Sequence, residues 1–416
     1  MREGKIIKLY REKLGMTQEQ LGNGICSVTH ISKIERGITE YSSEIIMLLS
    51  KRLNINLDEE IIRFNGVNNI LHRWLDSMVR EEKDRIEEYA ELLEKEPLVL
   101  LSDYKNCYQL IKAWYFLTKG SLDDANKIIK SMKKEKLPKF EENLFKHISG
   151  LYLLLIGEVN ESIRTLKTID PNIYHNPEYF YHLGIAYHYK NSNVLAYYYA
   201  DKAIQHFQKT KNIIKIIDCE LLMLSQIPIG ELNGDFDEFY EFYERYEHII
   251  KNCNMIQNKI KKSKALNNLA YVCYRMNLFE KAVNLYNESM ELKEANSQIY
   301  LISLYGYVNS CLKGNLIDRF SLLEAAHRGL QIAKTIKDES YQILFKLFIY
   351  KVNNKTEQYF HYLRTKALPY YSTYPYVKLE MAYIKELFEH FITTSKNDDA
   401  LLLAKEFIRK APVEIF

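Results

Sequence analysis

The chain has 416 residues, of which 47% are hydrophobic and 27% charged, and its formal net charge is +3 at pH 7. This length predicts two or more domains, and the composition is ordinary for a globular protein. The small net charge excludes a general binder of polyanions. No run of about 18 apolar residues occurs, so a membrane span is not expected. The six cysteines are scattered without a C-x-x-C spacing. Together with the lack of a signal peptide, this predicts reduced thiols and a cytoplasmic location.

The first predicted elements are a helix over residues 4–14 and then two short helices around a tight turn. Thr17 is placed to cap the first short helix, and Gln20 three residues later closes a capping box. Ser27 is placed to cap the second short helix, and Gly37 follows its last turn, where a helix often ends. The pattern therefore predicts a helix-turn-helix.

The second short helix has two different faces. Val28, Ile31 and Ile34 share one side and are predicted to point at a core, whereas Thr29 and Lys33 fall on the other side. Residues 1–36 carry seven Lys or Arg and four Glu, so the positive charge of this region lies on the same segment. A short helix with an apolar back and a basic front has the shape that enters the major groove of DNA.

These residues resemble two related families. The helix-turn-helix of Cro/phage-repressor-type regulators is matched by Arg11-x-x-Leu14-Gly15-Met16-Thr17-Gln18-x-x-Leu21 and by Ser27-x-x-x-Ile31-Ser32-Lys33-Ile34-Glu35-Arg36-Gly37. The segment over residues 26–35 is similar to the corresponding segment of the peptide-pheromone receptors of Gram-positive bacteria, of the PlcR, NprR and Rgg type. Its sequence is Cys26-Ser27-Val28-Thr29-His30-Ile31-Ser32-Lys33-Ile34-Glu35. The stretch from Leu21 to Ile31 is one residue shorter than in phage repressors, so their docking angle on DNA does not carry over. The resemblance implies a buried pair between Arg11 and Glu35.

The resemblance also implies which residues bind DNA. Four match positions that touch base edges: Val28, Thr29, His30 and Lys33. Ser32 and Arg36 match positions that contact the DNA backbone, Ser27 starts the same helix, and Gln18 matches a position that contacts phosphate or anchors the recognition helix. Helices over 43–53 and 58–64 would complete a five-helix domain over residues 1–65. Residues 66–69 are predicted to be a linker, because Gly and Asn there favour a turn.

From residue 70 to 416 the sequence shows helical periodicity and recurring helix pairs. Small residues lie twelve positions apart in the two helices of each pair: Ala113 and Ala125, Gly150 and Ser162, Gly184 and Ala196, Ala270 and Ala282. Successive pairs are spaced by 34 to 37 residues, and Leu266-x-x-Leu269-Ala270-x-x-Cys273 with Ala282-x-x-x-Tyr286 resembles a tetratricopeptide repeat. The predicted fold is all-α: the helix-turn-helix domain, then a right-handed tetratricopeptide-like α-solenoid of roughly eight or nine helix pairs.

The concave side of such a solenoid is where extended ligands bind. The repeat register places these side chains on it as peptide-binding candidates: Lys264, Asn267, Asn268, Tyr271, Tyr274, Arg275, Asn309 and His182. An asparagine amide both donates and accepts hydrogen bonds, so it can hold a peptide backbone. The resembling receptors also bind their peptides through asparagines on inner helices.

No P-loop, G-x-S-x-G, H-E-x-x-H or Rossmann glycine pattern occurs. We therefore expect no enzyme, no cofactor, no metal site and no membrane partner. The favoured hypothesis is a quorum-sensing transcription regulator that binds double-stranded DNA as a homodimer and is switched by a short signalling peptide. Two alternatives stay open: a phosphatase or inhibitor of a response regulator, and a prophage lysis–lysogeny peptide receptor. The direction of the switch is not readable from the residues.

Overall fold

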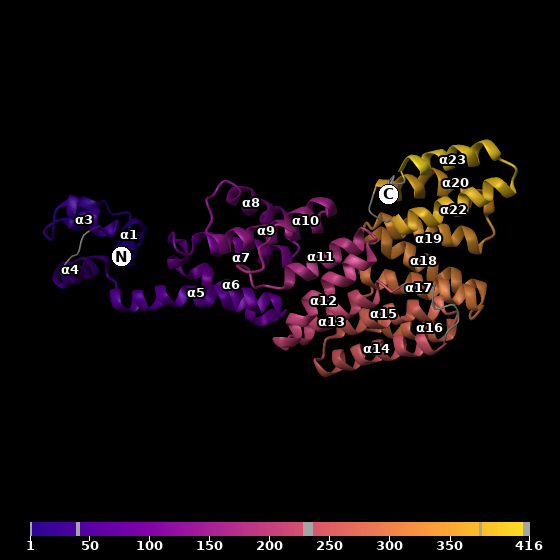
Figure 1. The fold of residues 1–416 in the computed structure, drawn as a ribbon, viewed down its shortest axis with the longest axis horizontal. Helices are drawn as coiled ribbons and strands as arrows, with labels where there is room; N and C mark the ends of the chain where they lie inside the picture. The colour runs from indigo at the N-terminus through magenta and orange to yellow at the C-terminus, as the bar shows by residue number, and fades with distance from the viewer. Residues whose placement is uncertain (1, 39–41, 228–235, 374–376, 411–416) are drawn as a thin grey trace. The chain divides into compact units, whose positions relative to one another are not determined.

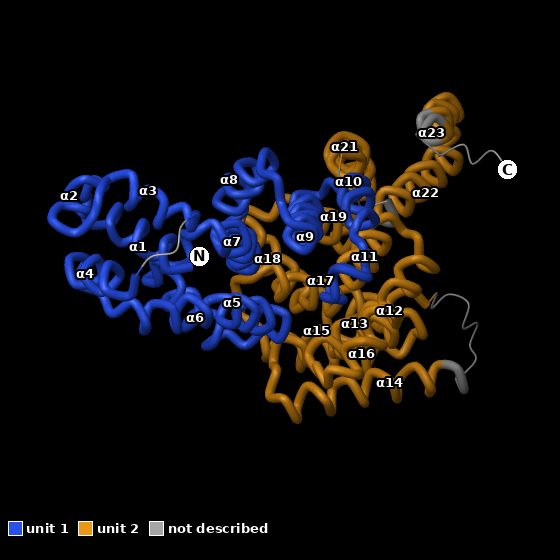
Figure 2. The backbone as a smooth tube through the Cα atoms, turned by 60° about the vertical axis from the view of Figure 1, so that its left-hand side comes forward, with its two compact units in different colours: residues 1–179 blue, residues 180–416 orange. Residues whose placement is uncertain are grey.

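The computed structural model describes residues 2–38, 42–227, 236–373 and 377–410, and these ranges contain helices and connecting turns but no β-strand. The fold is therefore all-α, as predicted, with a helix-turn-helix at the N-terminus and tetratricopeptide-like helical hairpins after it (Figure 1). The chain divides into two compact units, residues 1–179 and 180–416, which Figure 2 shows in different colours. Within the described ranges, no helix is both long enough and apolar enough to span a membrane.

Four helices and the start of a fifth form the N-terminal part: α1 (Arg2–Lys13), α2 (Gln18–Gly22), α3 (Val28–Glu35), α4 (Ser43–Leu53) and α5 (Leu57–Val79). Their core is made of fully or almost fully buried aliphatic side chains: Ile7, Leu21, Ile31, Ile34, Leu49 and Leu53. Both predicted caps are confirmed. Thr17 and Gln20 form a reciprocal capping box, and the Ser27 hydroxyl accepts from the backbone N–H of His30. Local hydrogen bonding thus fixes where the two short helices begin.

The predicted linker is wrong in its local structure, because residues 66–69 lie inside α5. The helix continues because Phe64, Val67 and Leu71 recur at helical spacing and each is at most 3% exposed. The hydroxyl of Tyr104 also donates to the backbone carbonyl of Phe64 at 2.8 Å. Burial of this stripe outweighs the weak helix propensity of Gly66 and its asparagine neighbours. The predicted domain boundaries at residues 65 and 70 stay a prediction.

The rest of the first unit is built of paired helices. After α6 (Lys83–Lys95) and a 3₁₀ turn over Pro97–Leu100 come α7 (Lys105–Thr118), α8 (Leu122–Met132), α9 (Lys139–Leu155) and α10 (Val159–Leu166). The predicted small residues lie where paired helices touch. A Cβ on Gly150 of α9 would lie 2.5 Å from the side chain of Leu166 on α10, and the Ser162 hydroxyl donates to the Gly150 carbonyl at 2.7 Å.

The division between the units falls within α11 (Glu178–Tyr189). The second unit continues with these helices: α12 (Asn193–Lys209), α13 (Ile213–Leu224), α14 (Phe236–Met255), α15 (Lys259–Arg275), α16 (Phe279–Glu291), α17 (Gln298–Gly314), α18 (Arg319–Thr335), α19 (Glu339–Val352), α20 (Thr356–Tyr362), α21 (Leu368–Thr373), α22 (Val377–Thr393) and α23 (Asn397–Lys410). A π-helical turn over Leu363–Ala367 joins α20 to α21. From α14 to α20 each helix packs on the next one in the chain (Figure 1). This order of contacts is typical of a solenoid.

Candidate functional site

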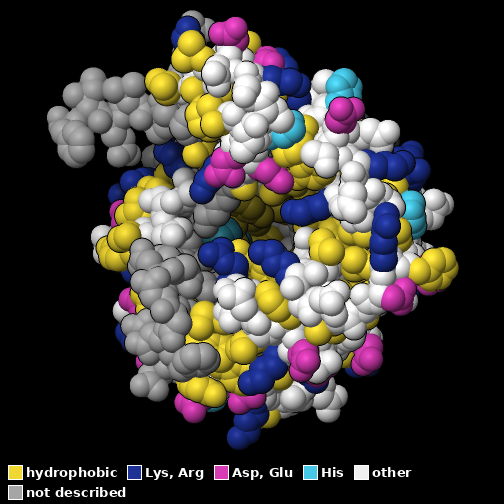
Figure 3. Space-filling view, turned by 90° about the vertical axis from the view of Figure 1, so that its right-hand side faces the viewer, with side chains coloured by type: hydrophobic (Ala, Val, Ile, Leu, Met, Phe, Trp, Pro, Cys, Tyr) yellow, Lys and Arg dark blue, Asp and Glu magenta, His cyan; other side chains and the backbone are white. Residues whose placement is uncertain are grey.

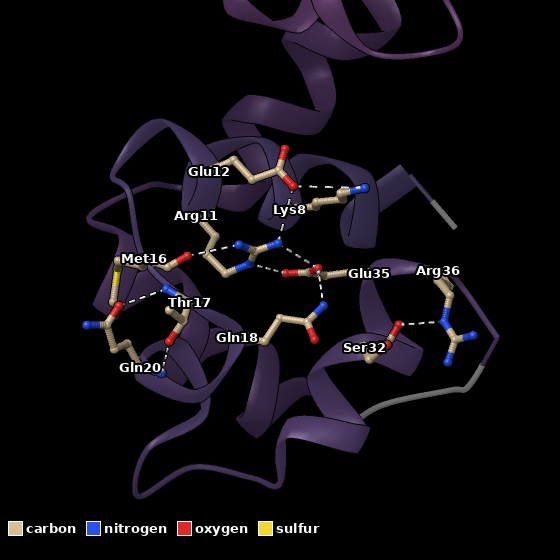
Figure 4. A network of polar contacts seen from close by, with 10 residues as sticks. All are labelled: Lys8, Arg11, Glu12, Met16, Thr17, Gln18, Gln20, Ser32, Glu35 and Arg36. Atoms are coloured by element: carbon tan, nitrogen blue, oxygen red, sulfur yellow. Dashed lines mark hydrogen bonds and ion pairs between the residues drawn. The ribbon is translucent and has the colours of Figure 1, made fainter.

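A buried ion pair holds the helix-turn-helix together (Figure 4). The Arg11 guanidinium on α1 donates to both carboxylate oxygens of Glu35 at the end of α3, at 2.6 and 3.0 Å. It also donates to the backbone carbonyl of Met16 at 2.9 Å, just before α2 begins. The hydrogen bond to Glu35 raises the pKa of Arg11, so the arginine stays charged. The predicted Arg11–Glu35 pair is thus confirmed, and it ties α1, the turn before α2 and α3 to one another.

Gln18 joins the same network from the first residue of α2. Its side-chain amide donates to Glu35 Oε2 at 2.8 Å, and the residue is half-buried. The resemblance gives this position two roles, contact with phosphate or anchoring of the recognition helix. The observed hydrogen bond to Glu35 corresponds to anchoring. A phosphate contact of Gln18 stays a prediction.

Most of the residues predicted to bind DNA lie on the open side of α3. Ser27, Val28, Thr29, Lys33 and Arg36 are exposed, whereas Ile31 and Ile34 are fully buried on the opposite side. The predicted core position of Val28 is wrong, because its side chain is 45% exposed. Val28 is the first residue of α3, and it lies one turn before the core contact that Ile31 makes. Its exposure leaves an apolar group beside Thr29, where it could contact a thymine methyl.

Ser32 and His30 are half-buried beside this exposed set. Arg36 Nε donates to the backbone carbonyl of Ser32 at 3.2 Å, and this bond holds the arginine along the end of the helix (Figure 4). The Nε2 atom of His30 is buried and makes no hydrogen bond to the described residues. In this orientation of the ring, the Nε2 atom is not accessible to a donor or acceptor on a base edge.

The second candidate surface lies on α15 and α17, where the structure brings several predicted residues together. The rings of Tyr271 and Tyr274 stack with centroids 6.5 Å apart, and Arg275 donates to the Tyr271 hydroxyl at 3.4 Å. The ammonium of Lys313, from the end of α17, lies 5.6 Å from the centre of the Tyr274 ring. These groups form an aromatic and cationic surface that spans two neighbouring repeats.

The asparagines of this surface are held by hydrogen bonds. Asn267 accepts from the hydroxyl of Ser303 on α17 at 2.7 Å, and Asn309 donates to the backbone carbonyl of Tyr305 at 2.7 Å. Asn268 hydrogen-bonds to Tyr246 of α14, whose burial raises its pKa. Lys264 is exposed one turn before Asn267 and Asn268. Binding of a peptide to these eight predicted residues, His182 included, is not tested by the structure and stays a prediction.

His182 on α11 is only 7% exposed and lies near a set of buried charged groups. The positive charge of Lys215 on α13 acts on it, and the Lys215 ammonium lies 3.9 Å from Asp218. Lys261 on α15 donates to both carboxylate oxygens of Asp218 at 2.6 Å. Lys215, Asp218 and Lys261 therefore link α13 to α15. The buried ring of His182 offers little surface to a ligand.

The pH dependence of stability tests this burial. Burial, and then the charge of Lys215, lowers the pKa of His182 to about 3. The unfolded chain takes up a proton near pH 6.5, whereas the folded chain does not until about pH 3. The stabilisation is therefore complete above pH 6.5 and is lost as the pH falls toward 3, by at most about 1.4 kcal/mol per pH unit. We expect His182→Gln to remove this part of the slope in urea unfolding between pH 4.5 and 7.5. The exposed His327→Gln is the control, and equal slopes in wild type and His182→Gln would contradict the assignment.

Four residues on or behind this second surface were missed from the sequence. Ser303 lies 36 residues after Asn267, which is the spacing of the two repeats, so aligning the repeats position by position would have found it. Lys215 and Asp218 fall on a helix that the repeat pattern does not cover. Lys293 lies in the turn after α16, where no periodic signal applies.

The face that carries the C-terminal helices is hollowed at its centre. Figure 3 shows hydrophobic side chains inside the hollow, and both Lys or Arg and Asp or Glu side chains around its edge.

These features define an all-α protein with a helix-turn-helix domain followed by a tetratricopeptide-like solenoid. Residues 7–59 match a helix-turn-helix family model, which covers α2, α3 and α4 completely. No curated protein matches the sequence closely enough to count as a relative.

Solved structures extend the likeness beyond the N-terminal domain. The apo form of the quorum sensor NprR from B. thuringiensis gives a TM-score of 0.66 at 20% identity, over 83% of this chain and 98% of that chain. NprR in complex with its cognate peptide NprX gives 0.64 at 21% identity, over 82% and 98%. A Rap protein complexed with competence and sporulation factor gives 0.64 at 14% identity, over 83% and 97%. At these identities the likeness shows the fold, which is that of the NprR and Rap regulators.

Proposed function

We propose that this chain is a cytoplasmic, quorum-sensing transcription regulator. It binds double-stranded DNA as a homodimer through α2 and α3, and a short signalling peptide bound against α15 and α17 changes that binding. One observation carries the proposal: a helix-turn-helix with an exposed basic face stands in the same chain as a solenoid that presents asparagines and tyrosines on neighbouring repeats. The likeness to NprR in complex with its cognate peptide supports the peptide half.

The DNA half follows from the chemistry of α3. Val28 and Thr29 offer methyl groups to thymine, and Lys33 offers a donor to guanine. Arg36 carries positive charge at the end of the helix, where it can contact phosphate and fix the register. The Arg11–Glu35–Gln18 network holds this face in place without using any of its exposed groups. Two copies related by a two-fold axis would read half-sites about 34–36 Å apart, or a multiple of that.

The peptide half follows from hydrogen-bonding capacity and from coupling. Asparagine amides and tyrosine hydroxyls can pair with the N–H and C=O groups of an extended backbone, whatever its side chains. The same surface joins α15 to α17, so a guest that bridges the two helices would favour one packing of the repeats. Such binding changes DNA affinity only if the peptide prefers one arrangement of the dimer over another.

Substitution of the basic residues of α3 tests the DNA half. We expect Lys33→Ala to weaken binding of full-length protein to the genomic DNA fragments it selects by about 1–3 kcal/mol and to relax base preference at one position. Arg36→Ala should weaken binding to all DNA sequences alike and lower the salt dependence of the binding constant by about one released ion. Lys130→Ala, an exposed lysine on α8, removes the same charge and serves as the control. Equal affinity of wild type and the three variants for the selected fragments would refute the DNA-binding half of the proposal.

A second candidate is an action on a response regulator, and the likeness to a Rap protein in fold is the observation that favours it. A phosphatase would need a Gln or Glu placed to orient an attacking water, and Glu87 on α6 is one candidate. Glu87 accepts from the Tyr115 hydroxyl at 2.8 Å and pairs with Lys119. The hydrogen bond from Lys119 lowers the pKa of Glu87, so the carboxylate is committed to these partners. Release of phosphate from a phosphorylated response regulator, measured with and without the protein, decides this candidate. If the protein does not accelerate phosphate release, the phosphatase version of this candidate is refuted.

A further inference from the structure

A buried polar network lies directly behind Asn267. Ser263 on α15, Ser289 on α16 and Ser303 on α17 are each at most 2% exposed. The ammonium of Lys293 donates to the Ser303 hydroxyl oxygen at 2.7 Å, and the Ser303 hydroxyl donates to Asn267 Oδ1 at 2.7 Å. The Ser289 hydroxyl donates to the backbone carbonyl of Ser263 at 2.7 Å. The network therefore connects a charged side chain in the turn after α16 with the surface of α15.

The order of donors and acceptors in this network follows from the lysine. A protonated lysine has three donors and no acceptor, so the Ser303 oxygen must accept from it. The hydroxyl proton of Ser303 is then free to be donated onward, and the nearest acceptor is Asn267 Oδ1, since Ser289 lies farther away at 3.1 Å. A hydroxyl that accepts from a cation is polarised and becomes a stronger donor itself. Burial lowers the pKa of Lys293 to about 8, so the ammonium form still predominates at pH 7.

The consequence appears at the other end of the chain of bonds. The positive charge favours the amide orientation of Asn267 that turns its carbonyl oxygen inward. Its NH₂ group then faces away from the network, and this nitrogen is neither buried nor hydrogen-bonded in the described structure. Without the cation, the amide could reverse and donate to Ser303 instead, because a hydroxyl oxygen can accept as well as donate.

We propose that Lys293 is a positioning residue that fixes the side-chain amide of Asn267 with its NH₂ group outward, so that this point of the α15 surface donates to a carbonyl oxygen of a bound peptide. This inference rests on the proposed peptide binding and makes it more specific. Asn267 reads an acceptor on the peptide backbone, and not an N–H group. Lys293 thus acts on a ligand that it does not touch.

The first experiment reads the amide itself and needs no ligand. Full-length protein is labelled with ¹⁵N-asparagine, and the side-chain NH₂ signals of Asn267 are assigned by their disappearance in Asn267→Asp. We expect Lys293→Met to shift this NH₂ pair and Lys293→Arg, which keeps a donating cation, to restore it toward the wild-type position. The control is Lys262→Met, which removes a lysine of the same helix pair that is ion-paired to Glu288 and lies outside the network. Wild-type Asn267 signals in Lys293→Met would overturn the inference.

The second experiment measures affinity. The probes are overlapping synthetic heptapeptides that cover the product of the next open reading frame after the gene. Loss of one hydrogen bond predicts about 2- to 12-fold weaker binding to Lys293→Met, with Lys293→Arg close to wild type. Ser303→Ala, which interrupts the relay and keeps the lysine, should weaken binding in the same way and replaces Lys293→Met if that variant does not fold.

The two experiments separate two kinds of failure. If no heptapeptide binds the wild-type protein, the peptide half of the proposed function fails, while the NH₂ signals still decide the orientation of the amide. If a heptapeptide binds wild type and Lys293→Met equally but binds Asn267→Ala poorly, the proposed function stands and the role of Lys293 is refuted.

Discussion

Replacing Glu35 by alanine should unfold the N-terminal helices far more readily than any surface change. The substitution leaves the Arg11 guanidinium buried without its carboxylate partner, and it also removes the acceptor of Gln18. Removing one partner of a buried pair typically costs about 3–5 kcal/mol, because the remaining charge is desolvated and unpaired. We expect hydrogen exchange of the α3 amides in the full-length protein to accelerate accordingly, and DNA binding to be lost with it.

Two further variants show whether an unpaired charge is the cause. Glu12→Ala removes an exposed carboxylate that also contacts Arg11, at 3.4 Å, and should cost less than about 1 kcal/mol. The double variant Arg11→Met with Glu35→Leu removes both charges and should recover much of the lost stability. Exchange rates in Glu35→Ala equal to those in Glu12→Ala would show that the pair does not hold α3 in place.

Gly4→Ala is expected to be the second severe change. A Cβ at this position of α1 would lie 2.0 Å from the backbone carbonyl oxygen of Ile34 and 3.2 Å from the Cα of Glu35. The obstruction is the backbone of α3 itself, so no side-chain rotation can relieve it. The two helices must move apart, which typically costs about 1–3 kcal/mol, more than alanine gains in helix propensity. The measurement is DNA affinity together with hydrogen exchange of α3.

A glycine in α5 provides the matched control. Gly66 has no atom within 4 Å of the position that its Cβ would take. Gly66→Ala should therefore stabilise the helix by up to about 1 kcal/mol and leave DNA binding unchanged. If Gly4→Ala left the hydrogen exchange of α3 and the DNA affinity unchanged, as expected for Gly66→Ala, then α1 would not pack as closely on α3 as described.

The features that could be predicted from the sequence are those that local chemistry decides. The capping box of Thr17 and Gln20 and the cap at Ser27 involve residues three positions apart, so the sequence contains both partners. The small residue at Gly150 also reports close helix packing directly, since a Cβ on it would lie 2.5 Å from the Leu166 side chain.

The features that could not be predicted depend on distant partners. Gly66 and its asparagine neighbours suggest a linker, but the contacts of Val67 and Leu71 keep the helix intact. The exposure of Val28 depends on where the core of the domain ends, which helical periodicity alone does not define. Lys293 was missed because it lies in a turn and its importance comes from Ser303, which is ten residues along the chain, on α17.

The most direct test of the whole account is a thermodynamic cycle on the full-length protein. The affinity for the selected DNA fragment is measured without peptide and with saturating heptapeptide, and the peptide affinity is measured with and without that DNA. We predict that each ligand changes the affinity for the other by the same factor, about 5- to 150-fold in either direction. DNA affinity that stays constant while the heptapeptide saturates the protein would contradict a peptide-switched regulator.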